Sequence, residues 1–132
     1  MDRAVSQLVR ERARQRCEYC HQPQEFSALS FHIEHVVARQ HGGLDDSANL
    51  ALACPDCNFR KGTNLTGLDP DTSEVTRLYH PRNELWDEHF LRCGARIEGK
   101  TAVGRTTVWL LEMNSRDRLR WRDVLIRLGL FD

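Results

Sequence analysis

Two cysteine pairs in this 132-residue chain have the spacing of metal ligands. Two residues separate Cys17 from Cys20, and two separate Cys54 from Cys57. A turn of this length can direct two thiolates to one ion, and two such turns complete the tetrahedral shell of a structural zinc site. We therefore expect a Zn²⁺ ion that holds the fold and has no open position for substrate. The alternative is four reduced core cysteines whose spacing is coincidental.

A segment that begins after the first cysteine pair and includes the second is rich in polar side chains. It reads SFHIEHVVARQHGGLDDSANLALACPDCNFRKG at residues 30–62. The candidate functional residues in it are His32, Glu34, His35, His41, Asn49, Asn58, Arg60 and Lys61. They fit either a catalytic site that uses a metal ion or a structural zinc site whose surrounding polar residues have no catalytic role.

Four elements are expected to position these residues. Residues 3–15 have helical periodicity, and residues 30–37 (SFHIEHVV) have the β-branched and aromatic content of a strand. The glycines and aspartates of HGGLDDSAN predict a loop, after which residues 50–53 return as a second strand. A helix over residues 55–61 begins at a proline and is closed by Gly62. The predicted order is strand, long loop, strand, helix.

This arrangement resembles the HNH nucleases in their zinc-containing form. The resemblance covers residues 17–62 and rests on CxxC, Glu-His in IEHVVARQHGG, Asn-Leu in SANLALAC, and CPDCNFRKG. It implies a ββα-metal fold, in which a hairpin with a long loop and a helix enclose one divalent ion. The later stretch DPDTSEVTRLYHPRNELWDEHF is similar to small stand-alone bacterial members of the family.

The resemblance assigns a role to four residues. His35 matches the general base that activates water, and Asn49 matches the asparagine that braces the loop. Glu34 and Asn58 match the two ligands of the catalytic ion. Glu34 stands where the family usually has Asp or His, and Asn58 stands where the final histidine of the motif would be. Oxygen ligands favour Mg²⁺ or Mn²⁺ as this ion, with Ni²⁺ or Zn²⁺ as alternatives.

Geometry limits how the motif can work. Neighbouring residues of a regular strand face opposite sides, so Glu34 and His35 serve one site only if the strand bends or ends there. Candidate substrate contacts are Arg60, Lys61, His32 and His41. For the first two the alternative is a solvated helix end, and for the two histidines it is a structural role.

The rest of the chain carries fewer signals. Nineteen basic and nineteen acidic residues cancel, but residues 1–16 and 115–127 each carry a local excess of three positive charges. A basic face or ordinary solvated helices would both explain this. Residues 78–99 suggest a turn at Pro81 and a hairpin, and residues 63–76 suggest an irregular connector. Two closing helices should bury apolar faces, Cys93 should be buried, and the tryptophans should lie in the core.

The expected fold class is therefore α+β. Residues 1–132 would form one domain, with an N-terminal helix, a ββα-metal core at 17–62 and a C-terminal helical extension at 67–132 that completes the core. No run of 18 apolar residues indicates a membrane span, and the charged N-terminus does not resemble a signal peptide, so we expect a cytoplasmic protein.

The function that the resemblance implies is metal-dependent endonucleolytic cleavage of DNA, leaving 5′-phosphate and 3′-hydroxyl ends. RNA stays an alternative substrate, and neither the target nor the oligomeric state follows from the sequence. Two other classes of function stay open. One is a catalytically inactive, zinc-stapled nucleic-acid-binding module, and the other is a protein-interaction domain, which the zero net charge favours slightly.

Overall fold

A computed structural model describes residues 2–131, which fold into two compact units. The first unit comprises the described chain through Asn64 together with His80–Asn83. The second comprises Leu65–Tyr79 and the described chain from Glu84 onward. Helices and small antiparallel sheets occur together, which confirms the α+β class. That the whole chain makes a single domain stays a prediction.

The first unit begins with α1 (Arg3–Arg12), whose N-terminus is capped by the Asp2 carboxylate. This helix is three residues shorter than predicted, because the chain turns through left-handed conformations at Arg14 and Gln15. Two of its arginines bind backbone within the unit: Arg10 donates to the Phe31 carbonyl at 3.1 Å, and Arg12 to the Leu50 carbonyl at 2.8 Å. Part of the basic charge of this segment is thus structural.

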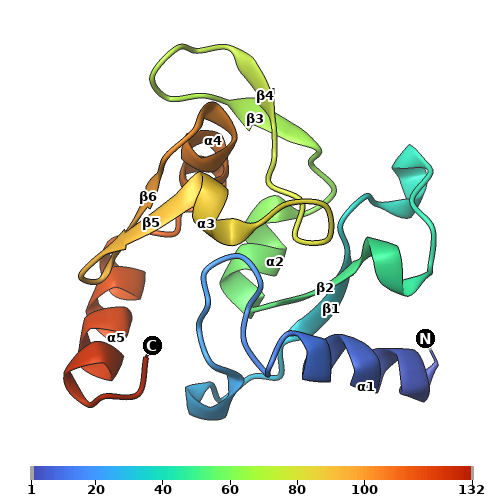
Figure 1. Ribbon diagram of the computed structural model, residues 1–132, viewed down its shortest axis with the longest axis horizontal. Helices are drawn as coiled ribbons and strands as arrows, with labels where there is room; N and C mark the ends of the chain where they lie inside the picture. Colours follow the sequence, from blue (N-terminus) through green and yellow to red (C-terminus); the bar gives the residue numbers. More distant parts are fainter. Residues whose placement is uncertain (1, 132) are drawn as a thin grey trace. The chain divides into compact units, whose positions relative to one another are not determined.

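The strand, loop, strand, helix order is confirmed (Figure 1). Strand β1 (His32–His35) pairs antiparallel with β2 (Leu50–Ala53), with Glu34 opposite Ala51 and His35 opposite Leu50. Helix α2 (Pro55–Lys61) follows at once, with Cys54 as its N-cap and Gly62 ending it. Three short 3-10 helices complete the unit: Gln24–Phe26, Arg39–His41 and Ser47–Asn49. Strand β2 is fully buried, so it forms the centre of this unit.

The second unit contains a hairpin that the sequence did not indicate. Strands β3 (Thr66–Leu68) and β4 (Val75–Arg77) pair antiparallel in the segment expected to be an irregular connector. They lack a buried alternate face, and that face is the pattern by which strands are recognised in a sequence. Contacts with α4 (Ala102–Leu110) hold them instead.

The remaining elements of the second unit are α3 (Trp86–His89), β5 (Phe90–Cys93), β6 (Arg96–Gly99) and α5 (Arg116–Arg127). Strands β5 and β6 form the predicted hairpin, and α4 packs on β6. The approach is close: a Cβ at Gly104 would lie 2.0 Å from the His89 carbonyl oxygen, so only glycine fits there. The core includes Phe90, Ile97 and Leu111.

Periodicity predicts that the last helix buries Trp121, Val124, Leu125 and Leu128, and this prediction is wrong at three of the four positions. Leu125 is buried, but Trp121, Val124 and Leu128 are exposed. Arg122 occupies the buried place, because its guanidinium donates to the carbonyl oxygens of Ala95 and Met113 at 2.6 and 2.9 Å.

Two further predictions for the second unit are also wrong. Cys93 is exposed rather than buried, and Trp109 is 68% exposed rather than part of the core. No helix within residues 2–131 has both the length and the apolar character needed to cross a membrane.

Candidate metal centre and active site

The four paired cysteines converge on one point. The sulfur atoms of Cys17, Cys20, Cys54 and Cys57 all lie within 4.8 Å of one another. The sulfurs of Cys20 and Cys54 are 3.7 Å apart. Four ligands each 2.3 Å from a tetrahedral zinc ion would be separated by about 3.8 Å. The cluster therefore fits Zn²⁺ and forms the predicted metal-binding site.

The surroundings of the cluster also fit a structural metal. The backbone amides of Cys20 and Cys57 point to the sulfurs of Cys17 and Cys54, at 3.5 and 3.4 Å. Burial raises the pKa of Cys17 and of Cys57 well above the ordinary thiol value. A metal ion supplies the positive charge that buried thiolates need. With four sulfurs in the shell, no position is left for substrate.

Glu34 is directed into the first unit, where 5% of its side chain is exposed. The Tyr19 hydroxyl donates to Oε1, and the Lys61 ammonium lies 3.4 Å from Oε2. Burial raises the pKa of Glu34, whereas the Lys61 charge and the Tyr19 hydrogen bond lower it. Both carboxylate oxygens of Glu34 therefore face protein groups in this arrangement. That Glu34 and Asn58 bind a catalytic ion stays a prediction.

Lys61 is directed inward and not to a substrate surface. Only 2% of its side chain is exposed, and Nζ donates to the carbonyl oxygens of Val36 and His35 at 2.9 and 3.4 Å. Its position at the end of α2, directly after the exposed Phe59 and Arg60, gave no sign of this. The ammonium therefore joins the end of α2 to the end of β1, in addition to neutralising Glu34.

His35 ends β1 and faces the loop that follows it. Its Nε2 lies 2.7 Å from Oδ1 of Asp45, and 20% of its side chain is exposed. The same Asp45 oxygen accepts a hydrogen bond from Nε of Arg39 at 2.9 Å. Glu34 and His35 thus point to different partners, as the alternation of a strand requires.

Asn49 links the two ends of the loop. Its Oδ1 accepts from the Val37 amide at 2.9 Å, and its Nδ2 donates to the carbonyl oxygens of Val37 and Leu44 at 2.9 and 2.8 Å. The Val36 amide also donates to the Asn49 carbonyl. Both hydrogens of this buried amide and one lone pair of its oxygen are used, so the loop is held next to His35.

A glycine makes this brace possible. A Cβ at Gly43 would lie 1.7 Å from the Val37 carbonyl oxygen and 2.9 Å from Nδ2 of Asn49. Any larger residue would push the loop away from the strand end. The second glycine of the HGG sequence is therefore explained by close packing at the brace.

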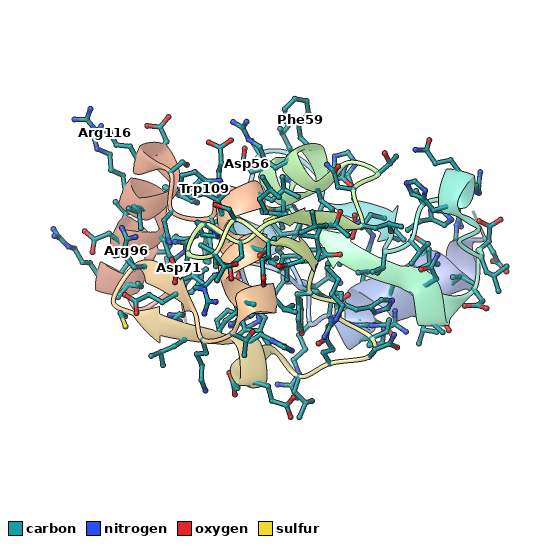
Figure 2. The ribbon with its side chains drawn as sticks, turned by 90° about the horizontal axis from the view of Figure 1, so that it is seen from above. Asp56, Phe59, Asp71, Arg96, Trp109 and Arg116 are labelled. Atoms are coloured by element: carbon teal, nitrogen blue, oxygen red, sulfur yellow. The ribbon has the colours of Figure 1, made fainter. Side chains whose placement is uncertain are left out.

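The other predicted residues lie at or near the surface, on α2, on β1 and in the 3-10 helix Arg39–His41. Asn58 is partly exposed, and no partner for its side chain is found within residues 2–131. Arg60 is exposed, with its guanidinium 5.7 Å from the ring centre of Phe59. Phe59 is 78% exposed and points away from the ribbon (Figure 2). His32 and His41 are exposed and have no side-chain hydrogen bond among the described residues.

Sequence reasoning missed Tyr19 and Asp45. Tyr19 lies inside the CEYC turn, between two predicted metal ligands. A buried tyrosine needs a hydrogen-bond partner for its hydroxyl, and this requirement was the signal that could have found it. Asp45 is one of two adjacent aspartates in a stretch interpreted as turn chemistry. Asp46 has that role, because its carboxylate accepts from the Ala48 amide, whereas Asp45 reaches His35.

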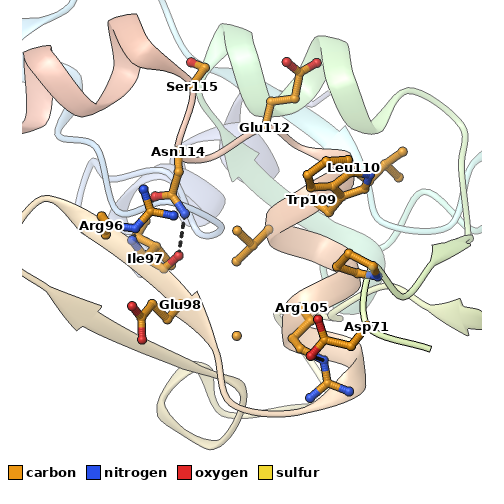
Figure 3. Close-up of a pocket in the computed structure, with 13 residues that line it drawn as sticks. Asp71, Arg96, Ile97, Glu98, Arg105, Trp109, Leu110, Glu112, Asn114 and Ser115 are labelled. Atoms are coloured by element: carbon orange, nitrogen blue, oxygen red, sulfur yellow. Dashed lines mark hydrogen bonds and ion pairs between the residues drawn. The ribbon is translucent and has the colours of Figure 1, made fainter. Parts of the chain in front are cut away.

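The second unit contains a cavity of about 850 Å³. Arg96 and Glu98 line one side, and Trp109 and Arg105 the other (Figure 3). Arg105 is already paired, with Nη2 2.7 Å from Asp69. None of the described residues that line the cavity is a histidine or a cysteine.

Comparison with known proteins agrees with the geometry of the first unit. The model of the HNH endonuclease family matches residues 17–64, which contain the cysteine cluster, β1, the loop, β2 and α2. The chain is also 25% identical, over 118 residues, to the Septu protein PtuB of Bacillus thuringiensis. That alignment covers 88% of this chain and 43% of PtuB, so the chain spans less than half the length of this relative. No solved structure was found to match the chain.

Proposed function

We propose that residues 17–64 form an endonuclease that hydrolyses DNA phosphodiester bonds with His35 as general base. The observation that supports this most is the position of His35 at the end of β1, partly exposed and held against a loop that Asn49 braces. A base must keep one orientation to accept a proton efficiently. The match of residues 17–64 to the HNH endonuclease family model supports this reaction class.

In this proposal each residue has a limited task. His35 removes a proton from water, whose oxygen forms a bond to the phosphorus atom as the bond from phosphorus to the 3′ oxygen breaks. The 3′ oxygen takes a proton from solvent, which gives a 5′-phosphate and a 3′-hydroxyl end. Asn49 keeps the loop in place, and Arg60 with the exposed ring of Phe59 offers a cation and a stacking surface to the nucleic acid. His32 and His41 are exposed candidates for further contacts. The four cysteines hold a structural zinc that takes no part in the reaction.

Metal dependence is a separate part of the proposal. Mg²⁺ or Mn²⁺ is expected from the family, with Ni²⁺ or Zn²⁺ as alternatives. Asn58 is free to act as one ligand, but Glu34 would first have to leave Tyr19 and Lys61. No step is therefore assigned to a metal ion, and the role of Glu34 as a ligand stays a prediction.

The engaged carboxylate of Glu34 favours one alternative function. A domain that lost its catalytic ion would bind nucleic acid without cleaving it, and would use the zinc only for stability. Such a module would show affinity that falls steeply with salt, and replacing His35 would change neither its affinity nor its products.

Both candidates are tested with purified, zinc-loaded protein and a panel of substrates. Supercoiled, nicked, branched and single-stranded DNA and an RNA are each incubated with Mg²⁺, Mn²⁺, Ni²⁺ or Zn²⁺ after mild chelation. We expect cleavage of at least one DNA, leaving 5′-phosphate ends. Salt-dependent binding without cleavage of any substrate would support the inactive module, and cleavage of RNA alone would correct the substrate.

A further inference from the structure

Asp45 is the partner of the proposed general base. Its Oδ1 lies 2.7 Å from His35 Nε2 and 2.9 Å from Arg39 Nε. The hydrogen bonds from His35 and then Arg39 hold the pKa of Asp45 below its ordinary value. The carboxylate is therefore ionised at neutral pH and can only accept hydrogen bonds.

The backbone around Asp45 is fixed on both sides. The preceding carbonyl, of Leu44, accepts from Nδ2 of Asn49 at 2.8 Å. The following carbonyl, of Asp46, accepts from the Asn49 amide at 3.0 Å, and the Asp46 carboxylate caps the Ala48 amide at 3.1 Å. Asp45 is 67% exposed, yet its position in the chain is set by the same asparagine that braces the loop.

We propose that Asp45 is a positioning residue, which holds His35 in the tautomer with hydrogen on Nε2 and so makes Nδ1 the proton-accepting atom. The inference rests on the proposed function, because it assigns a role within that reaction. A neutral imidazole carries one hydrogen, and an anionic carboxylate at Nε2 requires the hydrogen to be there. Within residues 2–131 the Nδ1 atom has no hydrogen-bond partner.

The contact has a second effect during the reaction. When Nδ1 takes the proton from water, the ring becomes a cation, and a carboxylate already at Nε2 stabilises that charge without having to move. Arg39 limits the excess negative charge that Asp45 would otherwise place near a phosphate, because both side chains meet at one oxygen. Loss of Asp45 should therefore slow the chemical step more than it affects binding.

The first test observes the ring and does not depend on activity. Zinc-loaded protein with ¹⁵N-labelled histidine is studied by NMR at a pH where the ring is neutral, and the signals of His35 among the six histidines are assigned by their loss in His35→Ala. We expect hydrogen on Nε2 in the wild type and a mixture of tautomers in Asp45→Asn, because the amide can both donate and accept. Asp46→Asn is the matched control: it removes the same charge one residue away and keeps a good cap.

The second test measures kcat and KM on the best DNA substrate. Asp45→Asn should lower kcat by about 10- to 100-fold without raising KM, and Asp45→Glu should recover part of the loss. Asp46→Asn should keep the wild-type kcat. A His35 ring with hydrogen on Nδ1 in the wild type, an unchanged tautomer in Asp45→Asn, or a higher kcat in that variant would each overturn the proposal.

The two tests separate this inference from the proposed function. If wild-type protein cleaves no nucleic acid, the proposed function fails, while the tautomer of His35 still shows whether Asp45 sets the ring. If the wild type cleaves DNA and the ring is not governed by Asp45, the nuclease stands and the role of Asp45 is refuted.

Discussion

The ammonium of Lys61 lies 3.4 Å from the carboxylate of Glu34, at a place where 2% and 5% of the two side chains are exposed. Such a pair gains from Coulomb attraction in a poorly solvated place and loses the hydration of both ions. Here the hydroxyl of Tyr19 and the carbonyl oxygen of Val36 supply hydrogen bonds that replace part of that hydration. The pair therefore joins the cysteine turn, β1 and the end of α2.

Removing one member of this pair should destabilise the protein strongly. Lys61→Met leaves the Glu34 carboxylate buried without its counter-charge, and we expect the free energy of unfolding to fall by about 3–5 kcal/mol. Urea unfolding of zinc-loaded protein measures this. The double variant Glu34→Gln/Lys61→Met should be more stable than the sum of the two single changes predicts. Strictly additive effects would show that the two charges do not interact.

Asn49 offers a test of the loop brace. Asn49→Ala removes three hydrogen bonds, each contributing about 0.5–1.5 kcal/mol, and should lower both stability and the rate of DNA cleavage. Asn49→Asp keeps the acceptor and loses both donors, so it should also be destabilised in urea unfolding. The matched control is Asn64→Asp, where one exposed residue loses one donor bond, to the Lys61 carbonyl. Equal effects at the two positions would argue against a special role for Asn49.

If the cysteine cluster holds a metal ion, the five thiols of the chain should react with a thiol reagent at different rates. Cys93 is exposed and should react rapidly with a thiol reagent in the native, zinc-loaded protein. The other four are buried in the cluster and should react only after a strong chelator or denaturant releases the metal. In Cys93→Ser the fast reaction should vanish, and release of about one zinc ion per chain should accompany exposure of the rest. Rapid reaction of the clustered thiols in native protein would contradict a bound metal.

The contact between Asp69 and Arg105 should make the stability of the second unit depend on pH in acid. The hydrogen bonds with Arg105 lower the pKa of Asp69 to about 2, whereas an unfolded aspartate titrates near 3.9. Because the folded pKa is the lower one, the stabilisation is complete above about pH 4 and is lost as the pH falls toward 2. Asp69→Asn should therefore be less stable than wild type at pH 7, with a difference that shrinks in acid.

Tryptophan fluorescence follows this effect selectively. Trp86, Trp109 and Trp121 are the three tryptophans of the chain, and all lie in the second unit, so their fluorescence reports on that unit. Asp71→Asn is the control, because Asp71 contacts the same arginine but is 66% exposed. A pH-independent difference between wild type and Asp69→Asn would refute the assignment.

The parts of the fold that the sequence predicted are those fixed by local chemistry. Pro55 begins α2 and Gly62 ends it, and both residue types have these preferences in any protein. The cysteine spacing predicted the metal cluster for a similar reason, since few arrangements can satisfy four paired thiolates.

What the sequence could not predict depends on tertiary contacts. The inward direction of Lys61 is set by carbonyl oxygens 25 and 26 residues away, and the contact of Asp45 with His35 bridges ten residues of loop. The exposed hairpin of β3 and β4 is held by α4 rather than by its own pattern. In α5, hydrogen bonds of Arg122 to two carbonyl oxygens override the apolar periodicity.

The most direct test of the nuclease is the rate at which His35→Ala cleaves the preferred DNA under single-turnover conditions. Circular dichroism and zinc content first establish that the variant is folded, and added imidazole serves as an external base. We expect a rate at least about 100-fold below wild type, partly restored by imidazole, because general-base catalysis contributes about 10²–10⁴-fold. A folded, zinc-loaded variant that cleaves DNA as fast as wild type would contradict the account.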